Sequence, residues 1–402
     1  MRVGIVGCGV SGLASAIVLA RAGTNVTIFE RFEQPRPIGA GLLLQPSGLS
    51  VLDILGLGEA VRAMGARVDS LDGRTLKGRP VLSLVYERWK PDSFGLGIHR
   101  AALFDILFRT ATGAGATVVT GAQIVGIDDV EKPVVRDVQQ RAHGPFDLLL
   151  IADGSASALR TVAAPKARAP LYPWGALWAA LPAPDALWEG CLNQRYGGAS
   201  IMMGVLPIGL APHAGAQRHV AFFWSIRHDQ MEAWKSGGLD AFKARVRSLW
   251  PEAGALIASI KSPDVFAPAS YRDVAARPWR KGRTLLIGDA AHGTSPQLGQ
   301  GANLALVDAV ELGAALAARP DSIDEALTLY VKERSAHVRW FQTLSAALTP
   351  VFQSRSKTIG ALRDILMAPM CELPIVRRLM LETLCGVAQP PRSVWTPPHI
   401  KE

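Results

Sequence analysis

Three glycines near the start of the chain have the spacing of a phosphate-binding turn. Gly7, Gly9 and Gly12 fit the pattern GxGxxG, between the apolar run Val3–Val6 and the helical pattern Leu13–Ala22. Glycines let the backbone approach a pyrophosphate closely, and the N-terminus of a helix offers free N–H donors to an anion. The spacing therefore favours a dinucleotide-binding turn over a purely structural one.

An acidic residue stands where such a turn needs one. Glu30 ends a second strand-like run, Val26–Phe29, so the two runs and the helix between them form a βαβ unit. Its carboxylate can accept hydrogen bonds from both hydroxyl groups of an adenosine ribose. The same charge would repel a 2′-phosphate, so we expect a dinucleotide without that group. Ser11 and Arg31 are further predicted cofactor contacts.

Two later motifs also follow apolar runs that are typical of buried strands. One begins at Asp153 and ends at Arg160, and the other extends from Gly288 to Asn303. Asp153 and Arg160 could belong to a cofactor site, or they could form only a surface ion pair. The end of the second motif, Gly299–Asn303, opens a long apolar helical pattern, where free N–H groups favour an anion unless the glycines serve only as a turn.

With these three motifs in order, the sequence resembles the class A flavoprotein monooxygenases, of which para-hydroxybenzoate hydroxylase is the familiar member. The segment from Pro296 to Asn303 and the stretch after Phe352 are most similar to the ubiquinone-biosynthesis hydroxylase branch. The resemblance implies bound FAD and NAD(P)H as a transient reductant, since no second GxGxxG is present. It also implies transfer of one oxygen atom from O2, through a flavin hydroperoxide, to an aromatic or electron-rich small molecule.

The resemblance assigns cofactor contacts residue by residue. Gly288 and Asp289 are expected at the ribityl chain, where a polyol would satisfy the carboxylate; the less favoured alternative for Asp289 is an N-cap of the next helix. Arg100 is expected near the pyrophosphate and the backbone of Ile124 near the adenine. The remaining predicted contacts lie in the motifs or beside them: Gly41, Asp153, Pro296, Gly299, Gly301, Ala302 and Asn303.

No residue is identified as a base for the substrate. Pro296 and His292 are the candidates for a catalytic role, although the corresponding histidine in this family is usually structural. The substrate candidates are Arg195, Tyr196, Met202, Phe222 and Trp224, on strands expected to cover the cavity. Alternate residues of a strand face opposite ways, so the sequence leaves open which of them line the cavity and which only pack the sheet.

These residues require an α/β fold: a Rossmann-like FAD-binding domain with an inserted antiparallel-sheet substrate domain and a helical C-terminal region. The predicted bounds are 1–170 and 272–330 for the first, 171–271 for the second and 331–402 for the third. The inserted domain is expected to be an antiparallel meander of four strands: 174–181, 191–196, 200–208 and 219–226.

Composition narrows the function classes further. The chain has 402 residues, 49% of them hydrophobic, which excludes disorder. The net charge is +9, but the basic residues are scattered, so nucleic acid is not an expected partner. The four cysteines have no metal-site spacing. No signal peptide or apolar run of spanning length is found, and we expect a cytoplasmic monomer or homodimer whose helices after Phe352 touch at most a membrane surface.

Three other functions share parts of these patterns. A flavin reductase or dehydrogenase on the same scaffold is the main alternative. A flavin-dependent halogenase is disfavoured, because the Trp-x-Trp-x-Ile-Pro segment of that group is missing. A non-enzymatic prenyl-GTPase escort protein would share only the βαβ unit, whereas the whole segment 288–303 points to retained flavin.

Overall fold

The first of two large sheets is parallel except for its edge strand β17 (Arg280–Lys281), which pairs antiparallel with β18 (Thr284–Leu286). A computed structural model describes residues 1–35, 39–183, 186–212, 215–389 and 393–398. The six strands of this sheet, in spatial order, are β17, β18, β11 (Leu148–Ile151), β1 (Arg2–Val6), β2 (Asn25–Phe29) and β7 (Thr117–Val119). All four residues of β11 are buried, as expected for a strand covered on both faces. The predicted βαβ unit is confirmed by β1, β2 and the helix between them.

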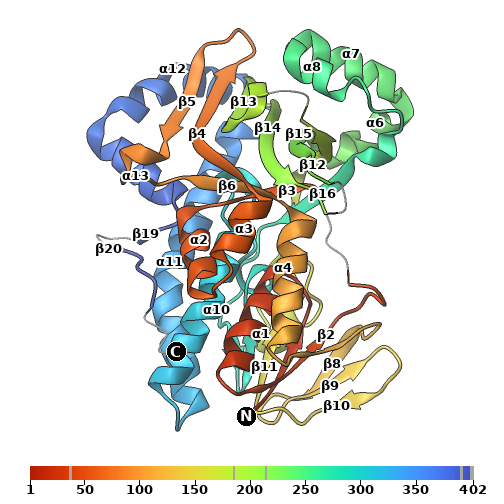
Figure 1. Ribbon diagram of the computed structural model, residues 1–402, viewed down its shortest axis with the longest axis vertical. Helices are drawn as coiled ribbons and strands as arrows, with labels where there is room; N and C mark the ends of the chain where they lie inside the picture. Colours follow the sequence, from red (N-terminus) through yellow and green to blue (C-terminus); the bar gives the residue numbers. More distant parts are fainter. Residues whose placement is uncertain (36–38, 184–185, 213–214, 390–392, 399–402) are drawn as a thin grey trace.

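The second large sheet lies above the first (Figure 1). Its eight successive strands are β16 (Ala267–Arg272), β12 (Leu171–Pro182), β15 (Arg218–Arg227), β14 (Ile201–Leu210), β13 (Gly190–Gly197), β4 (Ala66–Thr75), β6 (Gly95–His99) and β3 (Gly41–Leu44), and β5 (Pro80–Val85) pairs with β4. Smaller sheets contain β8 (Ile124–Asp129), β9 (Val134–Asp137) and β10 (Ala142–His143), and β19 (Ala388–Gln389) with β20 (Ser393–Val394).

The four predicted strands of the inserted region are present, but the prediction of a simple meander is wrong. β13, β14 and β15 are joined as antiparallel neighbours, whereas β12 pairs with β15 and not with β13. The free edge of β13 pairs in parallel with β4, from a distant part of the chain. Local alternation predicts a strand but carries no information about a partner so far away. The predicted domain bounds stay predictions.

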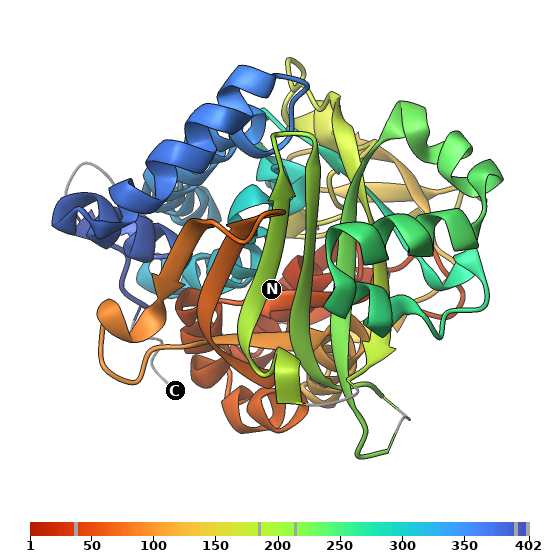
Figure 2. The same cartoon turned by 90° about the horizontal axis from the view of Figure 1, so that it is seen from above.

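Helices cover the sheets in three groups (Figures 1 and 2). Beside the first sheet and below the second in Figure 1 lie α1 (Val10–Arg21), α2 (Pro46–Ile54), α3 (Gly58–Met64), α4 (Arg100–Gly113) and α10 (Gly301–Ala318), of which α2 and α3 contact β3 and β6 of the second sheet. One face of the second sheet is covered by α6 (Met231–Gly237), α7 (Leu239–Leu249) and α8 (Pro251–Ile257). The C-terminal group is α11 (Ile323–Phe352), α12 (Lys357–Glu372) and α13 (Pro374–Leu384); α5 (Arg160–Ala163) and α9 (Asp289–His292) are short.

Helix α10 packs among the helices beside the first sheet. This sheet and the helices beside it carry the motifs predicted to bind flavin, and we call them the flavin-side layer. Helix α10 is the one helix among the described residues that is long and apolar enough to cross a membrane, but it packs against α1, α2 and α11. The crossing with α1 is close, because a Cβ on Gly313 would lie 2.3 Å from Cγ1 of Val18. These contacts are those of a helix in the core of a globular domain.

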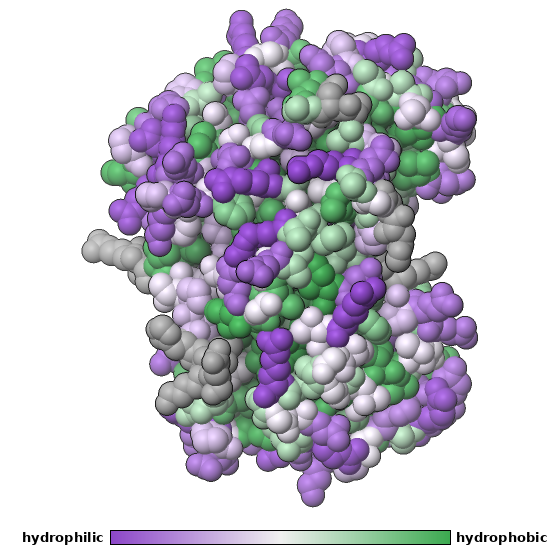
Figure 3. All heavy atoms as spheres, viewed as in Figure 1, coloured by the Kyte–Doolittle hydropathy of each residue, from purple (hydrophilic) through white to green (hydrophobic). Residues whose placement is uncertain are grey.

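The C-terminal helices leave apolar side chains on the outside. Helix α12 exposes a row of large ones: Ile359, Leu362, Leu366 and Met370, followed by Leu373. On the face drawn in Figure 3, hydrophilic side chains cover much of the upper and lower ends, and apolar ones gather between them. Contact of the C-terminal helices with a membrane surface or a second copy stays a prediction.

Asn303 joins the start of α10 to strand β3. Its side chain is fully buried, its Oδ1 accepts the N–H of Gln45 at 2.8 Å, and its Nδ2 donates to the carbonyl oxygens of Leu43 at 3.2 Å and Gly299 at 3.1 Å. Buried amides are stable only with such partners. This residue therefore fixes the loop before α10 against the second sheet.

Replacing Asn303 by Asp tests whether these three hydrogen bonds hold the loop before α10 in place. The variant loses both N–H donors and brings a carboxylate oxygen next to two carbonyl oxygens, so we expect the free energy of unfolding to fall by about 1–3 kcal/mol or more. Denaturant unfolding of the wild type and the variant measures the difference. Equal unfolding midpoints would show that the side chain is not held as described.

Candidate functional site

The glycines of the N-terminal turn differ in what surrounds them. Gly7 has φ +108°, and a Cβ there would lie 2.4 Å from the carbonyl oxygen of Ala152. Gly12 lies in the first turn of α1, which begins at Val10, and a Cβ there would lie 2.0 Å from the carbonyl oxygen of Gly7. Around Gly9, in contrast, no described atom lies within 4 Å of such a Cβ. Protein packing thus explains two of the glycines and leaves open space beside the third.

Helix α1 presents its N-terminus to that space. Gly9 is the N-cap and supplies no side-chain acceptor for the first N–H groups of the helix. Nearby, the Glu30 carboxylate is nearly buried and accepts the N–H groups of Cys8 at 3.1 Å and Phe32 at 2.9 Å. Burial, with a smaller effect of Glu30, raises the pKa of the Cys8 thiol to about 12, so Cys8 is not a thiolate. The turn therefore combines free donors with a fixed acceptor.

The first and third motifs meet in space. Ser11 is buried in α1, and its hydroxyl group has no hydrogen-bond partner among the described residues. Its Oγ lies 2.7 Å from where a Cβ of Gly288 would stand, and Gly288 has φ +60°. The next residue, Asp289, is exposed and begins α9, so its carboxylate does not cap that helix as an N-cap would. The site gathers a free hydroxyl group and a free carboxylate beside the open turn.

Arg160 connects the second motif to the third. It is 5% exposed and donates to the carbonyl oxygens of Ala290 at 2.7 Å, Ser155 at 2.7 Å and Gly154 at 3.1 Å. The alternative of a surface ion pair with Asp153 is wrong, because the guanidinium is buried and occupied by backbone carbonyls. Burial raises the pKa of the Asp153 carboxyl. Arg160 is thus a positioning residue for the turn that carries Asp153.

A buried charge network holds the Gly288 turn. The Asp308 carboxylate accepts the Gly288 N–H at 2.9 Å, Nε of Arg334 at 2.8 Å and Nε2 of His292 at 2.6 Å. Burial opposes ionisation of Asp308, but His292 and Arg334 together hold its pKa well below the usual range. His292 is 2% exposed, so it faces this network and no substrate. We therefore assign His292 a positioning role instead of a catalytic one.

The loop before α10 leaves the N-terminus of that helix open. Gln300, the N-cap, provides no side-chain acceptor, and Gly299 has φ +62° with no described atom within 4 Å of a Cβ built on it. A Cβ on Gly301 would meet only Oδ1 of Asp289, at 3.6 Å. Ala302 and Pro296 are half-buried beside this opening. Asn303, predicted as a cofactor contact, instead bonds to protein groups through its whole amide.

The other predicted cofactor contacts are spread over three elements. Arg100 is exposed at the start of α4, with its Nη1 3.0 Å from a Cβ built on Gly39. Ile124 is buried in β8, and the exposed Arg31 lies over the ring of Phe32. Gly41 is required by packing, because a Cβ there would lie 2.5 Å from Cγ2 of Ile208. Packing alone therefore explains Gly41.

The structure fixes which strand residues face the flavin-side layer. Phe222 and Trp224 belong to the apolar cluster with α7 and α8, and the guanidinium of Arg195 lies 4.6 Å from the ring of Trp250 in that cluster. These three substrate candidates therefore face away from the flavin-side layer. Tyr196 and Met202 lie on the opposite face, and the sequence missed two of their neighbours. Those are Phe223 on β15 and Trp178 on β12, which are directly paired across the two strands and so lie on this face.

A hydrogen-bonded chain links the loop before α10 to the second sheet. Nε2 of Gln297 donates to Oε1 of Gln353 at 2.6 Å, and Nε2 of Gln353 donates to Oγ of Ser225 at 2.6 Å. The three residues come from the loop, the end of α11 and strand β15. Sequence alone carries no signal for this chain, because its members are far apart along the chain.

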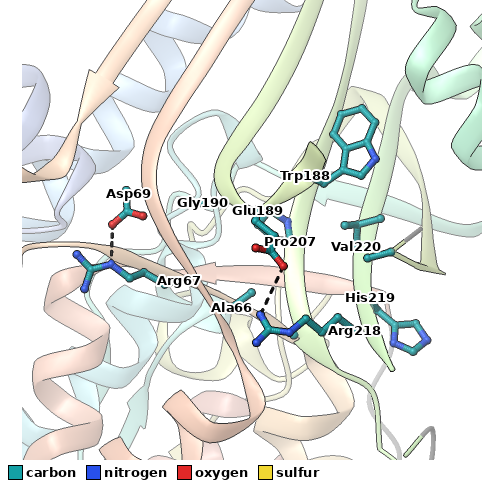
Figure 4. Close-up of a pocket in the computed structure, with 12 residues that line it drawn as sticks. Ala66, Arg67, Asp69, Trp188, Glu189, Gly190, Pro207, Arg218, His219 and Val220 are labelled. Atoms are coloured by element: carbon teal, nitrogen blue, oxygen red, sulfur yellow. Dashed lines mark hydrogen bonds and ion pairs between the residues drawn. The ribbon is translucent and has the colours of Figure 1, made fainter. Parts of the chain in front are cut away.

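A separate groove of about 350 Å³ lies elsewhere on the second sheet (Figure 4). Its charges are paired, Arg67 with Asp69 at 2.6 Å and Arg218 with Glu189 at 4.0 Å. None of the predicted site residues lines it. Within the described part of the chain, no group of His, Cys, Asp and Glu side chains is placed to hold a metal ion.

Comparison with known proteins agrees with this geometry. The family model described as FAD binding domain matches residues 1–344. The 6-methylpretetramide 4-monooxygenase of Streptomyces rimosus is 32% identical over 76% of this chain and 72% of its own length. The 3-hydroxybenzoate 6-hydroxylase of Polaromonas naphthalenivorans is 28% identical over 83% of each chain. Klebsiella pneumoniae HpxO, solved with FAD and uric acid, has the same fold, with a TM-score of 0.79 at 21% identity over 97% of each chain.

His337 makes the stability of this network depend on pH. Burial, followed by the charge of Arg334, lowers the pKa of His337 to about 3, and its Nε2 lies 3.0 Å from the carbonyl oxygen of Gly386. In the unfolded chain this histidine binds a proton below about pH 6.5, whereas in the folded protein it stays neutral down to about pH 3. The free energy of unfolding therefore falls as the pH falls from about 6.5 toward 3.

We expect His337→Gln to remove this pH dependence. Between pH 6.5 and pH 5, the stability difference between wild type and variant should narrow by roughly 1–2 kcal/mol. Denaturant unfolding at the two pH values gives the comparison. Parallel losses in both proteins would mean that His337 is not held neutral.

Proposed function

This chain belongs to the FAD-binding-domain family of class A flavoprotein monooxygenases, and we propose that it hydroxylates an aromatic small molecule. It is an FAD-dependent monooxygenase, and NAD(P)H is the reductant typical of the family. When bound, FAD supplies the redox chemistry with NAD(P)H and O2. The residues of this chain bind and orient the cofactor and enclose the substrate.

We propose a path for FAD along the open glycines. The pyrophosphate would lie over Gly9 at the N-terminus of α1, where donors are free. Glu30 would accept from the adenosine ribose, and Ser11 and Asp289 would bond to the ribityl hydroxyl groups. The N-terminus of α10 beside Gly299 would hold the isoalloxazine edge, where negative charge on the reduced ring is favoured.

The single observation that carries this proposal is the contrast between the glycines. Packing demands Gly7 and Gly12, whereas neither a neighbouring protein atom nor a left-handed φ explains Gly9, the N-cap of α1. Gly299 also has open space beside it, next to the uncapped N-terminus of α10, although its φ of +62° favours glycine by itself. A dinucleotide whose pyrophosphate lies over Gly9 and whose ring, anionic when reduced, reaches the N-terminus of α10 fits both positions. Arg100, Arg31, Ile124 and Pro296 stay predicted contacts. NAD(P)H as the reductant of this chain and a cytoplasmic location stay predictions as well.

Gly9→Val tests the pyrophosphate position. The space beside Gly9 and its extended φ of −87° accept a side chain, so the variant should fold normally but lose FAD, with affinity at least about a hundredfold weaker. Flavin content of the purified protein and its thermal unfolding are measured together.

Two controls separate folding from binding. Gly113→Val also adds a side chain in open space, at the end of α4, and should keep both fold and flavin. Gly12→Val should destabilise the apoprotein itself, since its Cβ meets the carbonyl oxygen of Gly7. Full flavin content in Gly9→Val would contradict the assignment.

Turnover tests the reaction. The sequence has no second GxGxxG motif for a resident nicotinamide dinucleotide, so NAD(P)H must reach the flavin transiently. We expect substrate binding to open this access and to increase the rate of NAD(P)H oxidation at least about tenfold. Mass spectrometry should find the aromatic product heavier by one oxygen atom. A rate that does not respond to any aromatic ligand, with hydrogen peroxide as the sole product, would favour the reductase or oxidase alternative.

A further inference from the structure

The face of the second sheet toward the flavin-side layer is lined by uncharged side chains. Side chains alternate between the two faces along β12, β13, β14 and β15, and the residue pairing between these strands fixes which side chains share a face. The large side chains on this face are Trp178, Leu192, Tyr196, Met202 and Phe223, and Phe352 from the end of α11 packs among them. We call this set the apolar wall. Trp178 and Leu192 are only half-buried, so the wall is not completely closed by protein.

The cations near the apolar wall are already engaged. Arg195 lies on the opposite face of the sheet, over Trp250. Arg227 ends β15 in a two-bond pair with Asp229, at 2.9 Å for its Nε. Arg363 lies behind the rings of Tyr196 and Phe352, fully buried, and bonds to Asp364 and the carbonyl oxygens of Val351 and Gly198.

One further cation lies at the other end of this face. Arg100 is exposed and close enough to Tyr271 to influence its hydroxyl group, although burial is the larger effect and raises the pKa of Tyr271. Tyr271 itself accepts a hydrogen bond from Nε1 of Trp178 at 3.1 Å. Arg100 begins α4, and its Nη1 lies 3.0 Å from where a Cβ of Gly39 would stand. On the proposed FAD path it contacts the pyrophosphate, so we assign its charge to the cofactor and not to the wall.

The polar groups of the wall are neutral. They include the amides of Gln194, Gln297 and Gln353 and the hydroxyl groups of Ser225, Tyr196 and Tyr271; the Tyr196 hydroxyl donates to Gln194 at 2.9 Å. Amide and hydroxyl groups can bond to a phenol or a ketone, but they do not compensate a carboxylate. Moving an unpaired carboxylate into such surroundings is strongly unfavourable.

We infer that the substrate is a neutral, largely apolar aromatic compound with a hydroxyl or carbonyl group, and not an aromatic carboxylate. The apolar wall would contact its rings, and the chain Gln297–Gln353–Ser225 would bond to its oxygen atom. This inference rests on the proposed function and narrows it. A hydroxybenzoate-type substrate would need a free cation that the apolar wall does not offer.

Matched ligand pairs test the inference on the FAD-loaded protein. The probes are 3-hydroxybenzoate with 3-hydroxybenzamide, and 6-hydroxy-2-naphthoate with 6-hydroxy-2-naphthamide, which differ in charge but hardly in shape. Dissociation constants come from perturbation of the flavin spectrum at neutral pH. We expect each amide to bind at least about tenfold tighter than its carboxylate.

Three outcomes would overturn the inference: equal affinities within a pair, tighter binding of a carboxylate, or no binding by any probe. A carboxylate that binds and gains one oxygen atom would remove the inference and leave the proposed function intact. Oxygen transfer to none of the probes or other aromatics, by protein with full flavin content, would count against the proposed function instead.

Two variants locate the selectivity. Leu192→Lys adds a cation to the half-buried edge of the apolar wall and should improve carboxylate binding relative to the amide by about tenfold or more. Arg195→Met changes the opposite face and should leave the ratio unchanged. A selective loss of carboxylate binding in Arg195→Met would show that Arg195 serves the substrate and would overturn the inference. Flavin content and thermal unfolding confirm that both variants are folded.

Discussion

The buried carboxylate of Asp308 joins the segments on which the flavin side of the molecule depends. It lies inside α10 and binds the turn at Gly288, the ring of His292 and the guanidinium of Arg334 on α11. A buried charge is tolerated only when its partners are in place, and loss of one partner leaves an uncompensated charge. The Gly288 turn, α9, α10 and α11 are therefore held in one arrangement. His337 extends the same network to the carbonyl oxygen of Gly386 near the C-terminus.

This fixed arrangement leaves two helix N-termini open. The charges of the network are satisfied inside the protein, whereas the first N–H groups of α1 and α10 have no side-chain cap. The two ends belong to helices that pack against one another through Gly313, so their separation is set by the core. On the proposed path, the pyrophosphate at one of these ends and the isoalloxazine ring at the other, which is anionic when reduced, would meet preformed donors and require little rearrangement of the protein.

The two faces of the second sheet have different roles: one packs the core, and the other is the face proposed to contact the substrate. One face packs on α7 and α8 through a core that includes Phe222, Trp224 and Trp250. The other face turns the apolar wall toward the flavin-side layer, and the chain from Gln297 to Ser225 links it to the loop before α10. A shift of one residue in the register of β13 would exchange Arg195 and Tyr196 between these faces. The chemistry of the proposed substrate site thus depends on strand pairing as much as on residue type.

The local features of this protein were determined by its sequence alone. The turn at Gly7–Gly12, Glu30 at the end of β2 and helix α10 all depend on neighbouring residues, whose preferences act over a few positions. The FAD-binding class followed from such local motifs. Tertiary structure alone decided that β4 pairs with β13, that Asn303 bonds to protein groups through its whole amide, and that Arg195 faces Trp250. These outcomes depend on contacts between distant segments, whose energies are settled only when the whole core packs and every buried polar group finds its partner.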